Sequence, residues 1–241
     1  MIVKELEIIA ENYHKTSDIK DKFIEDISQK CFCSWVKEHF KCNKFVCEMG
    51  YGEGITANLL NEHFNDYLVI EGAPSLVRKA LRTNPQLMIK ETLFENFVPE
   101  ENFDLILALH VLEHVNEPLE ILQMMRQWIK PDGEIIILVP NRNSIHRLLA
   151  KEMGLIQNLD DLSARDHLVG HQRVYDLDSL KTDAKNAGFE VVKEAGFFLK
   201  PLPNSMMLDF NHDLLMAMNS LSSVLPPTLM ANICLSIAPT N

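Results

Sequence analysis

Three glycines at alternate positions, placed directly after an apolar β-prone run, constrain this chain more than any other stretch. The run extends from Lys44 to Met49 and includes Glu48, and the glycines that follow are Gly50, Gly52 and Gly54. Glycine lets a backbone turn sharply and approach a ligand closely where a strand passes into a helix. The stretch therefore predicts a nucleotide-binding turn at the end of a first strand.

The spacing of this turn differs from that of a dinucleotide-binding fingerprint. Such a fingerprint is G-x-G-x-x-G, whereas the third glycine here comes one residue earlier. The carboxylate of Glu48 would repel a diphosphate but would suit a ligand with a positively charged end, such as the ammonium of an amino-acid moiety. A nicotinamide-dependent oxidoreductase is therefore a disfavoured rival.

Further blocks follow the glycine turn in the order of an α/β fold. The segment from Tyr67 to Glu71 is typical of a second strand that ends in an acid. The segment from Phe103 to Leu109 is nearly all apolar, as expected of a central parallel strand buried on both faces. Pro131, Asp132 and Gly133 indicate a break before another strand, from Glu134 to Val139.

Together, the four blocks between Lys44 and Asn141 resemble class I S-adenosylmethionine-dependent methyltransferases. The resemblance implies S-adenosylmethionine as the cofactor, ribose hydroxyls bound by Glu71, and adenine held by the residues after the third strand. Ligands of open α/β sheets lie outside the carboxyl ends of the strands, so the residues at the end of the fourth strand are also expected to face the cofactor. The expected cofactor-binding residues are Glu48, Gly50, Gly52, Gly54, Glu71, Thr92, Leu93, Phe94, Leu109 and His110. Phe94 fits equally well as a plain core aromatic.

The expected fold is α/β, with a Rossmann-like, seven-stranded, mostly parallel sheet, helices on both faces and an antiparallel last strand. One domain is expected over residues 1–241, since this length is ordinary for an α/β domain with insertions. Its parts are an N-terminal helical cap over 1–43 and a cofactor-binding half over 44–141. Substrate-side insertions are expected over 142–177 and 199–230, after the fifth and sixth strands.

Apolar spacing and breaker residues locate the remaining elements. An amphipathic helix over 18–40 either covers the cofactor site or merely covers the sheet edge. The Met-rich segment 206–221 is expected to be helical and to serve adaptable packing or a subunit contact. Further helices are expected over 55–64, 73–82, 117–129 and 178–186, and further strands over 87–90, 189–198 and 231–238.

The segment between the fifth strand and Tyr175 is too long for a simple connection, so helices and a functional role are expected in it. Its end, from Arg165 onward, is the densest polar stretch in the second half of the chain. A neutral hydroxyl acceptor benefits from a general base, and histidine is suited to that role. His171 is the first choice for this base and His167 the second, unless both only order the insertion. For His114, a hydrogen-bonded scaffold role is favoured over catalysis.

Composition and charge limit the classes of partner that the chain is expected to bind. The formal net charge of −11, without a long basic run, argues against a nucleic-acid partner. No stretch reaches the roughly 18 apolar residues of a spanning helix, and the N-terminus does not fit a signal peptide, so a cytoplasmic protein without a membrane partner is expected. No metal is expected, because the group of Cys31, Cys33, Cys42 and Cys47 fits a tetrahedral zinc site poorly and suits reduced thiols.

A weaker layer of resemblance concerns the segments 166–175 and 200–204. These look like the corresponding regions of methyltransferases of bacterial surface-polysaccharide and small-molecule biosynthesis. They make O-methylation of a sugar or sugar-phosphate intermediate the leading hypothesis, with a homo-oligomer as an open possibility. The alternatives are N- or C-methylation of another small metabolite, or a non-catalytic S-adenosylmethionine-binding protein.

Overall fold

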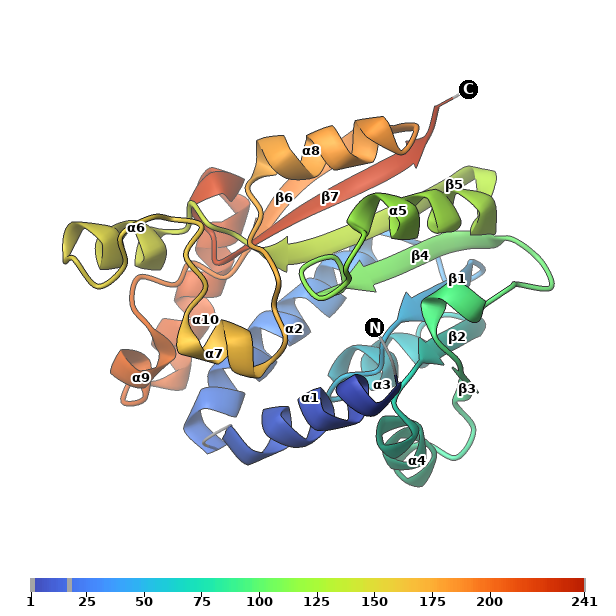
Figure 1. Cartoon of the computed structure of the whole chain (residues 1–241), viewed down its shortest axis with the longest axis horizontal. Coiled ribbons are helices and arrows are strands. Elements are labelled where there is room, and N and C mark those ends of the chain that lie inside the picture. Colours follow the sequence, from blue (N-terminus) through green and yellow to red (C-terminus); the bar gives the residue numbers. More distant parts are fainter. Residues whose placement is uncertain (1–2, 17–18, 241) are drawn as a thin grey trace.

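A seven-stranded sheet in the order β3-β2-β1-β4-β5-β7-β6 forms the centre of the computed structural model, which describes residues 3–16 and 19–240 (Figure 1). The first five strands are parallel to one another, and β7 is antiparallel to both β5 and β6. The mostly parallel sheet with an antiparallel last strand is thus confirmed. The strands are β1 (Phe45–Met49), β2 (Asp66–Glu71), β3 (Met88–Glu91), β4 (Phe103–Leu109), β5 (Ile129–Pro140), β6 (Phe189–Phe197) and β7 (Asn232–Pro239).

Helices cover both faces of this sheet, as expected. The helices α5 and α8 bury apolar side chains against one face, and α2, α3 and α4 do so against the other (Figure 1). The helices are α1 (Val3–Thr16), α2 (Ile19–His39), α3 (Ile55–Asn61), α4 (Pro74–Thr83), α5 (Pro118–Trp128), α6 (Ile145–Glu152), α7 (Ala164–Leu168), α8 (Leu177–Asn186), α9 (Asn204–Met207) and α10 (His212–Ser220).

The two faces carry separate apolar cores. On one face, Leu122 of α5 and Leu180 of α8 are fully buried, together with strand residues such as Ile137. On the other face, Val36 of α2 and Leu60 of α3 are buried to the same degree. Burying one such side chain contributes about 1.5–3 kcal/mol, so both layers hold the strand ends firmly in place.

Helix α2 is long enough to serve two cores. Its second half packs on the sheet, while Ile24 and Ile27 in its first half join a third cluster with Met207 and Met218 of the second insertion. The prediction of adaptable packing for the methionines is therefore confirmed for these two. The expected start of this helix, at residue 18, lies outside the described residues.

Helix α1 belongs to the helical cap expected over 1–43, but apolar spacing did not locate it as a separate helix. It carries Glu5, Glu7 and Glu11, and within residues 3–11 the apolar side chains that are at least partly buried are Leu6, Ile9 and Ala10. Short helices are marginal on propensity alone and are stabilised mainly by tertiary packing. Here the packing comes from α4 and α7, which are distant in the sequence.

The Met-rich segment over 206–221 does not form one helix. It divides into α9 and α10, and the side chain of Asn211 accepts a hydrogen bond from the amide of Leu214 at 2.8 Å, which caps the start of α10. Asparagine competes with the helix for its own backbone and therefore favours such caps over helix interiors. The expected helix over 55–64 likewise ends early, at Asn61.

Pro131, Asp132 and Gly133 lie inside β5 and not before it. The pairing of β5 with β4 jumps from Phe103 opposite Ile129 to Leu105 opposite Glu134. The extra residues are accommodated as an irregularity of the strand, which is how sheets tolerate proline and glycine. Among the helices of the described ranges, none has the length and apolar character needed to cross a membrane.

Candidate functional site

The glycine loop follows β1 directly and has left-handed backbone conformations at every glycine. The φ angles of Gly50, Gly52 and Gly54 are 84°, 52° and 82°. A side chain at the first two would meet nothing within 4 Å, whereas one at Gly54 would collide with the ring of Tyr51. The loop thus requires glycine for its conformation and leaves open space beside its first two glycines.

Glu71 ends β2 and holds this loop from the neighbouring strand. It is 6% exposed, and its two carboxylate oxygens accept hydrogen bonds from the amides of Tyr51 at 2.8 Å and Ala73 at 2.7 Å. Burial raises the pKa of Glu71, and the hydrogen bonds from the amides act in the opposite direction. A carboxylate oxygen can accept more than one hydrogen bond, so the expected contact with ribose hydroxyls stays a prediction.

Glu48 is buried beneath the loop, with 3% of its surface exposed. The hydroxyl of Tyr67 donates a hydrogen bond to its Oε2 atom at 2.8 Å. Burial raises the pKa of Glu48 to about 8, and the hydrogen bond from Tyr67 only partly opposes this. The side chain therefore carries a proton at neutral pH, and a nearby cation would be needed to favour the carboxylate.

The three adenine-pocket candidates follow β3 but do not share one environment. The amide of Thr92 donates to the carbonyl of Glu71 at 2.9 Å, and Leu93 lies against Gly72. Phe94 packs instead against the core on the α5 face. This packing supports the core-aromatic interpretation of Phe94. Only Thr92 and Leu93 lie beside the end of β2, the strand next to β1 and the glycine loop.

Helix α1 lies across the loops at this end of the sheet (Figure 1). The Oε1 atom of Glu7 accepts a hydrogen bond from the amide of Ser75, at the start of α4, at 2.7 Å. Leu6 fills the space beside Gly72, and Ile9 fills the space beside Gly170. The helix thus connects the loop after β2 with the segment after α7.

The loop after β4 begins with strained backbone and a buried acid. His110 has a φ of 55°, unusual for a residue with a side chain, and lies at the carboxyl end of the strand next to β1. Its Nδ1 atom lies 2.9 Å from Oε1 of Glu113. Glu113 is 0% exposed, and its other oxygen, Oε2, has no hydrogen-bond partner. Burial would raise the pKa of Glu113, but His110 and the nearby imidazoles outweigh it and lower that pKa.

His171 is oriented by a carboxylate that the sequence analysis leaves without a role. Its Nδ1 atom lies 2.8 Å from Oδ1 of Asp166. Asp166 is fixed in turn by a capping box with Ser163 at the start of α7. Burial raises the pKa of Asp166, yet the hydrogen bonds from His171 and Ser163 outweigh it and hold the pKa well below its ordinary value. The S-x-x-D pattern of that capping box is a sequence signal that could have identified this aspartate.

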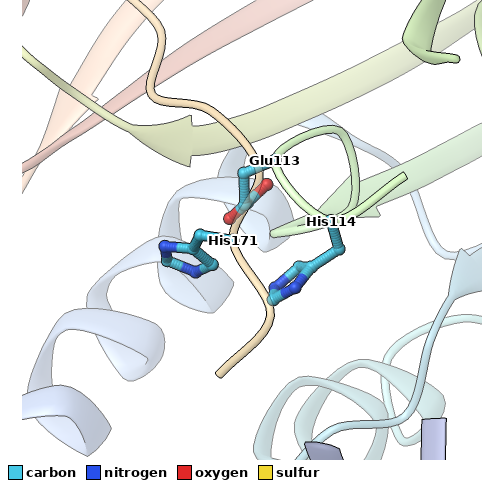
Figure 2. Close-up of side chains that lie close together, drawn as sticks. All are labelled: Glu113, His114 and His171. Carbon is cyan, nitrogen blue, oxygen red and sulfur yellow. The ribbon is translucent and has the colours of Figure 1, made fainter. Parts of the chain in front are cut away.

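Glu113, His114 and His171 form what we call the histidine cluster. Figure 2 shows their side chains converging, two from the loop after β4 and one from the segment after α7. One ligating atom from each lies within 4.8 Å of the others. The rings of the two histidines meet edge to face, with centroids 4.7 Å apart. Within residues 3–16 and 19–240, this is the group of histidine, cysteine and acidic side chains that could hold a metal ion.

Arg173 and Gln172 hold the two halves of the cluster together. The guanidinium of Arg173 donates to the carbonyls of Leu112 and Val115, and the amide of Gln172 donates to the carbonyl of Glu113 at 2.8 Å. These bonds join segments that lie far apart in the sequence. The polar stretch that begins at Arg165 thus supplies His171 and also Gln172 and Arg173, whose hydrogen bonds we call the clamp.

The other predicted residues lie outside the cluster. His167 is exposed on α7, which favours His171 as the candidate base. Leu109 packs against the core on the α2 face, one residue before His110. Burial lowers the pKa of His114, and its expected scaffold role stays a prediction. The five cysteines are free; Cys33 and Cys47 are buried, whereas Cys42 is exposed.

Comparisons with known proteins agree on the family. A family model described as "Methyltransferase domain" matches residues 20–194, which is more than half of the chain. A trans-aconitate 2-methyltransferase of Escherichia coli (strain 55989 / EAEC) is 26% identical over 137 residues, covering 56% of this chain and 54% of the relative. The chain thus spans about half the length of the curated relatives it matches.

Solved structures show the same fold. A S-adenosylmethionine-dependent methyltransferase from Thermotoga maritima, described as a possible histamine N-methyltransferase, has a TM-score of 0.64 at 12% identity and covers 96% of this chain and 100% of its own. The 1,6-didemethyltoxoflavin-N1-methyltransferase of Burkholderia thailandensis, solved with S-adenosylhomocysteine, has a TM-score of 0.60 at 14% identity, covering 100% of this chain and 92% of its own.

Proposed function

The chain belongs to the methyltransferase-domain family, and we propose that it transfers the methyl group of S-adenosylmethionine to a small molecule. The observation that carries this proposal is the glycine loop, with open space beside Gly50 and Gly52 and with Glu71 on the adjacent strand. Two alternate left-handed glycines without a neighbour leave room for a ligand to lie against the backbone.

Three contacts with the cofactor follow from this placement. The amino-acid end of S-adenosylmethionine carries an ammonium, which would favour the carboxylate form of Glu48. Glu71, at the end of β2, would accept hydrogen bonds from the ribose hydroxyls. Thr92 and Leu93 would flank the adenine, since they lie beside Glu71 and Gly72.

The acceptor would bind between the cofactor and the histidine cluster. Strands β1 and β4 are parallel neighbours, so the glycine loop and His110 lie at the same edge of the sheet. Methyl transfer from a sulfonium is an in-line displacement, and aligning its reactants contributes about 7–11 kcal/mol. The fold thus supplies a place where an acceptor oxygen, the methyl carbon and the sulfur can lie in line.

His171 is the proposed general base. Because Asp166 occupies Nδ1, the Nε2 atom is the nitrogen left for the acceptor. The acceptor hydroxyl gives its proton to Nε2 while its oxygen bonds to the methyl carbon. The carbon–sulfur bond breaks, and its electron pair stays on the sulfur, which leaves S-adenosylhomocysteine.

The proposed acceptor is a hydroxyl of a sugar or sugar phosphate used in surface-polysaccharide biosynthesis. A neutral hydroxyl needs a base more than an amine or a carboxylate does, and the His171–Asp166 pair supplies one. N- or C-methylation of another small metabolite is the alternative, and the Burkholderia thailandensis protein described above is named as an N1-methyltransferase.

The test uses the purified chain and S-adenosylmethionine labelled in its methyl group. Calorimetry should show binding of S-adenosylmethionine and S-adenosylhomocysteine, and label should move to members of a panel of sugars and sugar phosphates. Binding of NAD without S-adenosylmethionine would overturn the proposal. Binding of the cofactor without transfer to sugars, amines or acids would favour a non-catalytic binding protein.

A further inference from the structure

We propose that Glu113, His114 and His171 bind one divalent ion of the first transition row, such as Zn²⁺ or Mn²⁺. The first observation is their convergence, with one ligating atom from each within 4.8 Å of the others (Figure 2). The second is independent of it. The Oε2 atom of the fully buried Glu113 has no hydrogen-bond partner. A buried carboxylate oxygen left without a partner is costly, and a cation is the ligand that offsets the cost.

The donor set suits such an ion. Two imidazoles and one carboxylate are the protein ligands of several catalytic zinc sites and of non-haem iron sites, and both classes keep positions open for a substrate. With bonds of about 2.0–2.2 Å, the ligands of a tetrahedral ion lie about 3.4 Å apart. The ligand atoms must therefore approach one another by up to about 1.4 Å, which rotation of the side chains can supply.

Two of the three side chains are also held by a second contact at their other polar atom. His171 is bound by Asp166 at 2.8 Å, and Glu113 is bound through Oε1 by His110 at 2.9 Å. Contacts of this kind orient metal ligands and fix which histidine nitrogen faces the ion. The Glu113 and His171 atoms left for the ion are thus Oε2 and Nε2.

The clamp formed by Gln172 and Arg173 makes the site specific to the folded chain. It joins the loop after β4 to the segment after α7. Because the ligands come from both segments, an ion would also cross-link them. We therefore expect the ion to raise the melting temperature of the protein.

The catalytic consequence of this site rests on the proposed function. A hydroxyl that coordinates a divalent ion loses its proton more readily than a free one. With the ion bound, Nε2 of His171 is a ligand and no longer a base, so the proton of the acceptor hydroxyl passes to solvent water. The oxygen then attacks the methyl carbon as before, and the metal-loaded protein is the more active form.

The primary test is metal binding to the chelator-stripped full chain, followed by calorimetry with Zn²⁺ and separately with Mn²⁺. One ion per chain is expected, and Glu113→Gln and His114→Ala should each weaken binding at least about tenfold. His212→Ala, at an exposed histidine that begins α10, is the matched control and should bind the ion like the unmutated chain. Absence of binding, or equal binding by all variants, would overturn the proposal.

Two further measurements guard against misfolded variants. Asp166→Asn leaves all three ligands in place, changes the contact behind His171 together with the capping box at Ser163, and should weaken binding by about 10- to 100-fold. The visible spectrum of Co²⁺ bound to the unmutated chain should show nitrogen and oxygen ligation. A thiolate-to-metal band would place the ion at cysteines and overturn the proposal.

Titration of S-adenosylmethionine into the same samples separates the two proposals. Cofactor binding without metal binding would overturn the metal site and leave the methyltransferase proposal standing. Metal binding without cofactor binding would overturn the methyltransferase proposal and leave the metal site standing. If both bind, stripping the ion should lower methyl transfer, and adding it back should restore it; transfer that is unchanged would overturn the catalytic consequence.

Discussion

The glycine loop and the histidine cluster lie at the same end of the sheet, yet they are built in different ways. The loop from Gly50 to Gly54 is shaped by its own backbone and fixed by Glu71, one strand away. The histidine cluster depends on side chains from two segments more than fifty residues apart, joined by Arg173. Substitutions in the loop should therefore abolish ligand binding, whereas those in the cluster should change chemistry and leave the cofactor bound.

The largest effect is expected from Gly52→Val. The new side chain would occupy the open space where the cofactor is proposed to lie, so calorimetry should detect no binding of S-adenosylmethionine. Gly154→Val is the matched control, because Gly154 also has a positive φ and no neighbour within 4 Å but lies in the first insertion. Both variants should lose about 1–2 kcal/mol of stability, the cost of a left-handed backbone at a residue with a side chain. Equal loss of cofactor affinity in both would contradict the assignment.

His171→Ala should lower turnover by about 10²- to 10⁴-fold, the usual contribution of a general base. The affinity for S-adenosylmethionine should stay unchanged, because the lost interaction belongs to the transition state. Single-turnover transfer of the labelled methyl group measures the first quantity, and calorimetry measures the second. His212→Ala, remote from the cluster, should change neither. A joint fall in cofactor affinity and folding stability in His171→Ala would make His171 a structural residue and remove the contrast between the two regions.

Glu71→Ala should weaken cofactor binding by about 2–4 kcal/mol, the loss of two charge-assisted hydrogen bonds with some compensation by water. The amides of Tyr51 and Ala73 lose their acceptor as well, so the melting temperature should also fall. Glu91→Ala is a suitable control, since this exposed glutamate is the cross-strand partner of Glu71 on β3. An unchanged dissociation constant in Glu71→Ala would place the ribose elsewhere.

The smallest effect concerns the pH dependence of stability. Glu48 keeps its proton up to a pKa of about 8 in the folded chain, whereas an unfolded glutamate loses it near 4.5. The folded state thus binds more protons between these values, and the free energy of unfolding should fall as pH rises, by at most about 1.4 kcal/mol per pH unit. Glu48→Gln should remove this slope in urea unfolding measured at pH 6, 7 and 8. The same slope in Glu48→Gln as in the unmutated chain would contradict the assignment to Glu48, and exposed Glu190→Gln serves as the control.

Much of the cofactor half follows from short-range pattern. The apolar strands, the alternate glycines and the acid at residue 71 lie close together in the sequence, so their order predicts the sheet and its ligand-binding edge. The position of helix α1 could not be predicted in this way, because its apolar stripe is short. The helix is stabilised by the packing of Leu6 and Ile9 against Gly72 and Gly170, which are distant in the sequence. The division of the Met-rich segment depended on the cap at Asn211, which outweighed the apolar spacing around it.

By itself, the sequence determined the succession of strands along the chain, the place of the glycine loop and the polar stretch that contains His171, because each is encoded by residues that are near neighbours in the chain. Only the tertiary structure decided that Asp166 orients His171 and that the buried Glu113 has one carboxylate oxygen without a hydrogen-bond partner. It also decided that Glu113 and His171 lie beside His114. The physical reason is that side-chain contacts between distant segments depend on how the helices pack, and no local spacing of residues reports that packing.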